Sequence, residues 1–130
     1  MVRKVILVED DPDDRDLFIA FYAHRTDIKI LPSVGNGVEL ISFLESIEAD
    51  ENLPHLIILD QNMPLMNGKQ TLDYLKSNSR YSKIPAVVYS TYADTRLVLD
   101  CKKLGAGLVA SKPIDDEGYQ KMMDDFLKVI

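Results

Sequence analysis

The sequence predicts an α/β protein in which five βα units build one doubly wound, five-stranded parallel sheet with helices on both faces. Two observations predict this fold class. Short apolar segments rich in Val, Ile and Leu recur along the chain, and stretches with helical spacing separate them. The length of 130 residues and the hydrophobic content of 46% suit one globular domain. Residues 1–130 are therefore expected to form a single domain with no output domain.

Four apolar segments are predicted to be buried strands, at residues 5–8, 56–59, 86–89 and 107–110. Each is almost continuously apolar, without the strict alternation of a half-exposed strand, as expected for parallel strands covered on both faces. A fifth segment, at 28–34, is less apolar and contains Pro32. Because proline lacks the N–H that a central strand would donate, this segment is expected at an edge of the sheet.

Five helices are predicted from apolar residues spaced three and four positions apart. The clearest is the last, with a stripe made of Tyr119, Met122, Met123, Phe126, Leu127 and Ile130. The earlier helices carry Leu17, Phe18 and Phe21; Leu40, Leu44 and Ile47; Leu72 and Leu75 within 68–76; and Leu97, Cys101 and Leu104. Ligands of doubly wound folds bind beyond the carboxyl ends of the strands, so a functional site is expected there.

Composition excludes several function classes. The net charge of −6 argues against direct nucleic-acid binding, which depends on a surplus of Lys and Arg. No apolar run reaches the roughly 20 residues of a membrane span, and no cleavage-site pattern follows the N-terminus. The single cysteine, Cys101, excludes an internal disulfide framework. These features favour a cytoplasmic location.

Acidic residues follow two of the predicted strands. Glu9, Asp10 and Asp11 come directly after the first strand, and Asp60 ends the third. The fold brings these strand ends to one edge of the sheet, where clustered carboxylates repel one another unless a cation or shared protons compensate. Oxygen ligands of this kind suit Mg²⁺. The sequence therefore predicts a magnesium site at this edge.

The alternative for each of these acids is a structural role, because Asp is favoured at helix N-caps and Pro12 at a first helical position. Glu9 and Asp10 lie nearest the strand end and are assigned to the site. The acids that follow are expected to be caps or solvated surface residues, namely Asp13, Asp14 and Asp16.

A lysine and a serine follow two further strands. Lys112 comes after the fifth predicted strand and Ser90 ends the fourth, so both are expected at the same sheet edge as Asp60. Lysine can pair with a carboxylate and also neutralise phosphoryl oxygens. Either residue alone would be an ordinary loop residue.

With these residues in this order, the chain resembles the receiver domain of two-component response regulators. The resemblance covers essentially the whole chain and rests on four motifs in the family's order: Val-Glu-Asp, Leu-Asp-Gln-Asn-Met-Pro-Leu-Met-Asn-Gly, Ser-Thr and Lys-Pro. It implies a flavodoxin-like strand order of 2-1-3-4-5. The opening Glu-Asp-Asp-Pro-Asp-Asp also resembles single-domain regulators that serve phytochrome-like or hybrid kinases.

The resemblance implies a role for each site residue. Asp60 would be the phosphoacceptor, and Lys112 would contact the acyl phosphate. Asp10 and the main-chain carbonyl of Asn62 would bind Mg²⁺ or Mn²⁺ together with Asp60, and Glu9 would contribute to the acid pocket, often through water. Ser90 would move toward a phosphoryl oxygen and report phosphorylation to the fourth helix.

The resemblance also implies partners. A stand-alone response regulator accepts its phosphoryl group from a histidine kinase or phosphotransfer protein. It then controls a downstream protein, here expected to bind the face built by the fourth helix, fifth strand and fifth helix. Such a protein is a signal relay that catalyses only its own phosphorylation and dephosphorylation, and homodimer formation stays open.

Two departures from the family pattern concern switching. Val109 stands three residues before Lys112, where receivers frequently have an aromatic residue coupled to the hydroxyl switch. Thr91 stands where a smaller residue is common beside the phosphorylation site, so its bulk can hinder phosphoryl access. These two residues keep open the alternative of a pseudo-receiver, a protein-binding module that is never phosphorylated.

A haloacid-dehalogenase-like phosphatase is a third possibility, because it also uses an aspartate, a lysine, a hydroxyl and Mg²⁺. Its nucleophile would follow the first strand in an Asp-x-Asp-x-Thr context. The segment Glu-Asp-Asp-Pro-Asp lacks the threonine, which argues against this class.

Overall fold

The computed structural model describes all 130 residues as one three-layer α/β unit. Five parallel strands alternate with five helices along the chain, and the strand order is β2-β1-β3-β4-β5. This confirms the predicted fold class and strand order. The elements are β1 (Arg3–Val8), α1 (Pro12–Tyr22), β2 (Ile28–Ile30), α2 (Gly37–Glu45), the 3₁₀ turn η1 (Asp50–Asn52), β3 (Leu56–Asp60), α3 (Gly68–Ser77), β4 (Ala86–Ser90), α4 (Thr95–Lys103), β5 (Val109–Ser111) and α5 (Asp116–Leu127).

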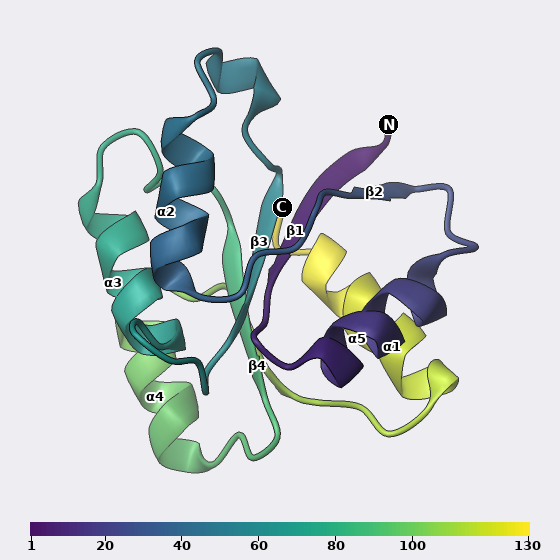
Figure 1. Cartoon of the computed structure of the whole chain (residues 1–130). Coiled ribbons are helices and arrows are strands. Elements are labelled where there is room, and N and C mark those ends of the chain that lie inside the picture. Colours follow the sequence, from purple (N-terminus) through teal and green to yellow (C-terminus); the bar gives the residue numbers. More distant parts are fainter.

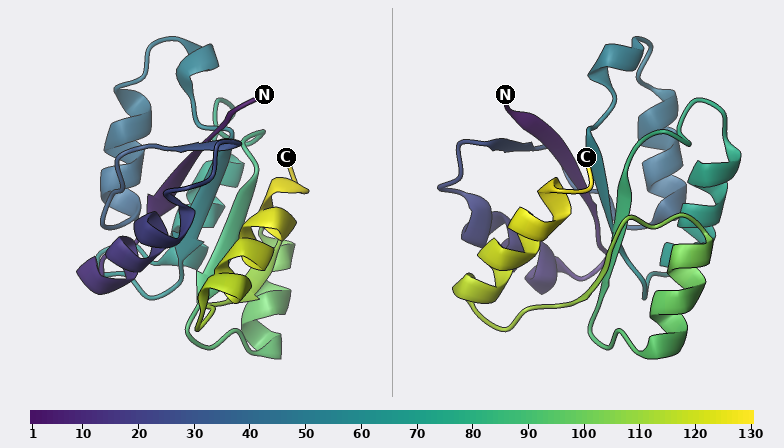
Figure 2. Two further views of the ribbon diagram at one scale, coloured as in Figure 1. Left: turned by 90° about the vertical axis from the view of Figure 1, so that its right-hand side faces the viewer. Right: turned by 180° about the vertical axis from the view of Figure 1, so that it is seen from behind.

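The helices cover the sheet in two layers. In Figure 1, α2, α3 and α4 lie on one side of the sheet, and α1 and α5 pack together on the other. Figure 2 shows the same two layers from the side and from behind. None of the helices is both long and apolar enough to cross a membrane.

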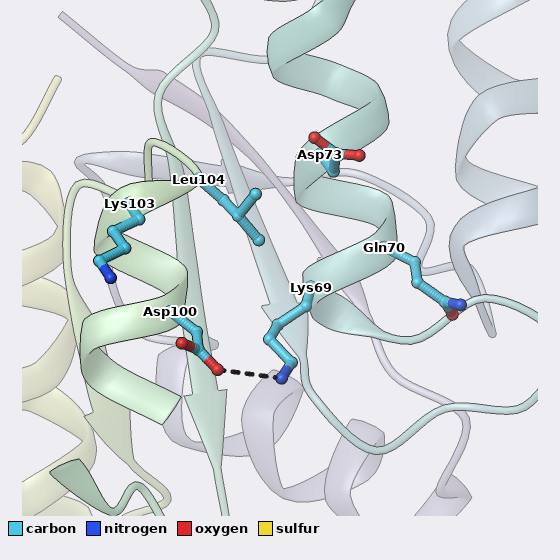
Figure 3. A pocket seen from close by; sticks show the side chains of 6 residues that line it. All are labelled: Lys69, Gln70, Asp73, Asp100, Lys103 and Leu104. Atoms are coloured by element: carbon cyan, nitrogen blue, oxygen red, sulfur yellow. Dashed lines mark hydrogen bonds and ion pairs between the residues drawn. The ribbon is translucent and has the colours of Figure 1, made fainter. Parts of the chain in front are cut away.

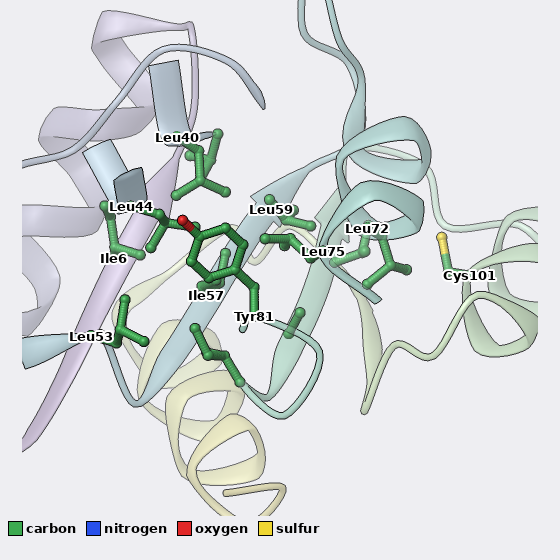
Figure 4. Close-up of a cluster of buried hydrophobic side chains, with 14 residues drawn as sticks. Ile6, Leu40, Leu44, Leu53, Ile57, Leu59, Leu72, Leu75, Tyr81 and Cys101 are labelled. Atoms are coloured by element: carbon green, nitrogen blue, oxygen red, sulfur yellow. The ribbon is translucent and has the colours of Figure 1, made fainter. Parts of the chain in front are cut away.

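Each layer has its own hydrophobic core, because successive strand residues point to opposite faces. On the α2–α4 side, Ile6, Ile57 and Leu59 of the central strands pack against Leu40 and Leu72 of the helices (Figure 4). The opposite core, between the sheet and α1 and α5, consists of Val5, Leu7, Phe18, Tyr22, Ile28, Leu56, Ile58, Val87, Tyr89, Tyr119, Met122, Met123 and Phe126. The predicted stripe of the last helix accounts for four of these residues.

The two edge strands differ from the expected segments. β2 pairs with β1 only over Ile28–Ile30, and beyond the exposed Pro32 a single bridge joins Val34 to Val8. Proline interrupts the ladder because it has no N–H, so the edge position is confirmed and the strand is shorter. β5 is Val109–Ser111 rather than 107–110, and none of its residues is buried, because an edge strand has a neighbour on one side only.

One residue of the apolar face predicted for α1 is not buried. Leu17 is 45% exposed, whereas Phe18 and Tyr22 are fully buried. The helix is thus rotated so that positions 18 and 22 face the sheet. Phe18 also makes an edge-to-face contact with the ring of Tyr22, with centroids 4.7 Å apart.

Candidate functional site

Three carboxylates meet where β1 and β3 end. These strands are neighbours, with Val8 beside Leu59, so the residues that follow them lie together. Glu9 follows β1 and is 1% exposed, and Asp60 ends β3 and is 2% exposed. Together with the exposed Asp10, they present oxygen atoms that all lie within 4.8 Å of one another. The sheet edge predicted to hold a cation therefore does gather these acids.

A small polar hollow at this edge brings together residues that follow four different strands. It contains no hydrophobic residue and is lined by Glu9, Asp10, Asp11, Asp14, Asp60, Asn62, Thr91 and Lys112. All residues predicted to bind the cation are among them, and so is the predicted lysine. Ser90 is not: it ends β4, is 2% exposed, and its carbonyl accepts a hydrogen bond from the Lys112 N–H at 2.8 Å.

Lys112 is the positive charge of the hollow. Its Nζ donates to Glu9 Oε1 at 2.9 Å and to Asp14 Oδ2 at 2.8 Å, and lies 3.3 Å from Asp60 Oδ1. Burial lowers the pKa of Lys112, but the hydrogen bonds to Asp14 and Glu9 raise it by more. The pKa of Lys112 therefore lies above its ordinary value. Lys112 is therefore firmly protonated and held by three carboxylates.

Asp60 is the most unusual carboxylate of the site. Its Oδ1 is buried and has no hydrogen-bond partner. Burial raises the pKa of Asp60, Glu9 beside it raises the pKa further, and Lys112 only partly opposes them. A buried oxygen without a partner usually indicates a functional role, because an unsatisfied polar atom is costly.

The donor set fits a hard divalent cation. One lysine offsets only part of the charge of three clustered carboxylates, and the unpartnered Asp60 Oδ1 has capacity for another positive partner. Carboxylate and carbonyl oxygens are the ligands that Mg²⁺ and Mn²⁺ prefer, and Asn62 lines the same hollow.

The loop that carries Asn62 is held at both ends. The Gln61 side chain accepts a hydrogen bond from the Lys69 N–H at 3.0 Å, and Asn67 and Gln70 form a reciprocal capping box at the start of α3. Gly68 is required here, because a Cβ on it would lie 2.8 Å from the carbonyl oxygen of Asp60. The sequence therefore fixes the main chain beside Asp60.

Two residues that contact the site were not assigned to it from the sequence. Asp14, expected to be a cap or surface residue, pairs with Lys112 from the first turn of α1. Tyr89, expected only as a strand residue, donates its hydroxyl proton to Glu9 Oε1 at 2.8 Å. A signal for Tyr89 is present, since a tyrosine in an otherwise apolar strand needs a partner for its hydroxyl. Nothing in the sequence distinguishes Asp14 from Asp13.

A second depression on the surface lies between α3 and α4 (Figure 3). It is an open groove lined by Lys69, Gln70, Asp73, Asp100, Lys103 and Leu104, and the Lys69–Asp100 ion pair of 3.3 Å crosses it. Its charges are of both signs and already paired in part, and it shares no residue with the acidic hollow. The candidate site is therefore the hollow at the strand ends.

Comparison with known sequences agrees with this geometry. The model of the response regulator receiver domain matches residues 5–124. The nitrate/nitrite response regulator protein NarL of Escherichia coli is 32% identical over 119 residues, which are 92% of this chain and 52% of NarL. A protein-glutamate methylesterase/protein-glutamine glutaminase of Clostridium acetobutylicum is 32% identical over 98% of this chain and 35% of its own. The chain thus spans a third to a half of these two relatives.

Solved structures are similar over nearly the whole chain. The phosphorylated cyanobacterial phytochrome response regulator RcpA is 26% identical with a TM-score of 0.83, covering 100% of this chain and 97% of its own. The Mn²⁺-bound response regulator Rcp1 is 27% identical with a TM-score of 0.75, covering 98% and 88%. With the family model matched over 5–124 and the acidic hollow at the strand ends, this chain belongs to the response regulator receiver domain family.

Proposed function

We propose that this chain is a phosphorylation-controlled signal relay that accepts a phosphoryl group on Asp60. The observation that carries the proposal is the buried Asp60 Oδ1, which accepts no hydrogen bond and lies 3.3 Å from Lys112 Nζ, in a hollow lined by further carboxylates. A buried carboxylate oxygen that accepts no hydrogen bond keeps a lone pair for attack on phosphorus, and the nearby Lys112 ammonium offsets part of its charge.

The proposed reaction forms a bond between an Asp60 carboxylate oxygen and phosphorus. The bond from phosphorus to the donor, a phosphohistidine of a kinase or phosphotransfer protein, breaks at the same time. Both the carboxylate and the donor are anionic, so their approach is opposed by repulsion. Lys112 supplies positive charge beside Asp60 and can follow the developing acyl phosphate with its long side chain.

Glu9, Asp10, Asp60 and the main-chain carbonyl of Asn62 are proposed to hold Mg²⁺ or Mn²⁺. When bound, the cation would neutralise charge on the carboxylates and on the transferred group. The Mn²⁺-bound form of Rcp1 and the phosphorylated form of RcpA, which have the same fold, support this assignment.

Ser90 is proposed to report the phosphoryl group to the rest of the molecule. It ends β4 next to Thr91, which lines the hollow, and an added phosphoryl group brings about −1.5 to −2 of charge and three acceptor oxygens. Val109 in the half-buried β5 provides no aromatic ring for a coupled rotamer switch. Movement of Ser90 and the loop after it is therefore the proposed signal.

The face of α4, β5 and α5 is the proposed surface for a downstream protein. Leu99 of α4 is 53% exposed and Ile114, between β5 and α5, is 97% exposed, and both are large apolar residues. Homodimer formation stays open, and a cytoplasmic location stays a prediction from the sequence.

Intact mass after incubation with acetyl phosphate tests the proposal. With Mg²⁺ the wild-type protein is expected to gain one phosphoryl group, and without Mg²⁺ it is not. Asp60→Asn should gain none. Asp73→Asn, which changes an exposed aspartate on α3, is the matched control and should behave like wild type.

A failure to gain mass with any phosphodonor would contradict the proposal. It would favour the pseudo-receiver, for which Thr91 provides a reason, because it lines the same hollow as Asp60 and is bulkier than the residue common at this position. Thr91→Ala would then be expected to restore phosphorylation if bulk alone is the obstacle.

A further inference from the structure

Tyr89 stands apart from the other residues of its strand. β4 reads Ala-Val-Val-Tyr-Ser, and Tyr89 is fully buried with its side chain in the core between the sheet and α1 and α5. Its ring contacts Phe18 edge to face, with centroids 6.5 Å apart. Packing alone would be served equally well by a phenylalanine, so the hydroxyl needs its own explanation.

The hydroxyl of Tyr89 points to the acidic site rather than to a backbone group. It donates to Glu9 Oε1 at 2.8 Å, and both residues are essentially without solvent exposure. The hydroxyl is therefore a proton donor to Glu9.

This hydrogen bond determines which oxygen of Glu9 has free capacity. Glu9 Oε1 accepts from Tyr89 at 2.8 Å and from Lys112 Nζ at 2.9 Å. Glu9 Oε2 accepts only the longer contact of 3.3 Å from the Asp11 N–H. Two strong donors on Oε1 hold the carboxylate in one orientation and leave Oε2 available to a cation or its water.

The ring of Tyr89 also contacts Lys112. The Lys112 Nζ lies 4.9 Å from the ring centroid, within the range of a cation–π interaction. One side chain thus contacts both Glu9 and Lys112, which come from opposite ends of the chain. The ring restricts Lys112, and the hydroxyl restricts Glu9.

We infer that Tyr89 is a positioning residue that holds the Glu9 carboxylate in place for a divalent cation at the acidic hollow. The inference rests on the proposed function, since it assigns a role within the same site. Hydrogen-bond partners of metal-site carboxylates fix the orientation of these ligands, and their loss typically weakens metal binding about 10-fold to 100-fold.

The experiment is direct Mn²⁺ binding to the protein without any phosphodonor, followed by the EPR signal of free Mn²⁺. Tyr89→Phe removes one oxygen atom and keeps the ring under Lys112, so it isolates the hydrogen bond to Glu9. Its dissociation constant is expected to rise about 10-fold. In this variant, the Mg²⁺ concentration that gives the half-maximal phosphorylation rate should rise. The maximal rate at saturating Mg²⁺ should change much less.

Tyr22→Phe is the matched control. Tyr22 is 1% exposed, lies in the same core, and donates its hydroxyl proton to the Tyr119 carbonyl at 2.6 Å, away from the hollow. Tyr22→Phe should lose about as much stability as Tyr89→Phe but should bind Mn²⁺ as the wild type does. Urea unfolding of both variants checks that each is folded.

A double-mutant cycle tests whether Tyr89 acts through Glu9. In a Glu9→Gln background, Tyr89→Phe should cause no further loss of Mn²⁺ affinity. The inference is overturned if Tyr89→Phe binds Mn²⁺ like wild type, if Tyr22→Phe is equally weakened, or if the wild type binds none. A wild-type protein that binds Mn²⁺ but takes no phosphoryl group would instead contradict the proposed function alone.

Discussion

Lys112 Nζ lies closer to Asp14 Oδ2, at 2.8 Å, than to Asp60 Oδ1, at 3.3 Å. The lysine that is proposed to neutralise a phosphoryl group is thus anchored by a residue of α1 before any phosphoryl group arrives. Asp14 is partly exposed and Lys112 is nearly buried, so the pair is only partly screened by water.

Asp14→Asn is therefore expected to destabilise the metal-free protein relative to Asp13→Asn. Both acids lie in the first turn of α1, so both substitutions lose a similar helix-dipole interaction. Only Asp14→Asn weakens the contact with Lys112, which is worth about 1 kcal/mol for a partly buried pair. Equal unfolding free energies in urea would contradict this prediction.

Gly68→Ala is expected to destabilise the main chain beside Asp60. A Cβ at this position would lie 2.8 Å from the Asp60 carbonyl oxygen and 2.9 Å from Gln61 Cα, which are backbone atoms that cannot move independently. A cost of about 1–3 kcal/mol is typical of such overpacking. Gly107→Ala is the control, since its new Cβ would meet only the Val129 side chain. Calorimetric unfolding compares the two, and a stable Gly68→Ala would contradict the steric argument.

Leu65→Asn is expected to stabilise the protein. Leu65 has a φ of 64° in the loop between β3 and α3, and its side chain is 81% exposed, so little apolar burial is lost. The left-handed conformation costs most residues about 1–2 kcal/mol, whereas asparagine adopts it more readily because its short polar side chain can hydrogen-bond locally. Alanine has no such side chain, so Leu65→Ala should gain nothing. A thermal midpoint of Leu65→Asn no higher than that of Leu65→Ala would argue against the idea.

His55 makes stability depend on pH at the opposite end of the sheet. Its Nδ1 accepts the Lys4 N–H at 2.8 Å, and burial, then the charges of Lys4 and Arg3, lower its pKa below the ordinary 6.5. The unfolded chain therefore binds the proton more readily than the folded protein. The stability contributed by neutral His55 is present above pH 6.5 and is lost as the pH falls toward the folded pKa.

His55→Asn keeps an acceptor at the same place and cannot be protonated. As the pH falls below 6.5, the unfolding free energy of the wild type is expected to decrease more than that of His55→Asn. Substitution of the exposed His24 by asparagine is the control for the loss of a histidine. Parallel profiles for wild type and His55→Asn would contradict the prediction.

The sequence alone is enough to predict the central sheet and the meeting of the acids. Continuous apolar runs identify buried parallel strands, and the carboxyl ends of such strands share one edge whatever the details of packing. For this reason the predicted alternation of strands and helices already places Glu9, Asp10 and Asp60 at one edge of the sheet. The motifs of the receiver family then place Lys112 and Asn62 at the same edge.

Edge positions and side-chain contacts are decided only by the tertiary structure. The half-exposed β5 and the exposed Leu17 depend on which neighbours cover a strand and on how far a helix is rotated, and periodicity does not encode either. The contacts of Asp14 and Tyr89 depend in the same way on where Lys112 and Glu9 arrive across the sheet. Sequence patterns determine which face a residue occupies, but the partner it meets there depends on the packing of elements far apart in the chain.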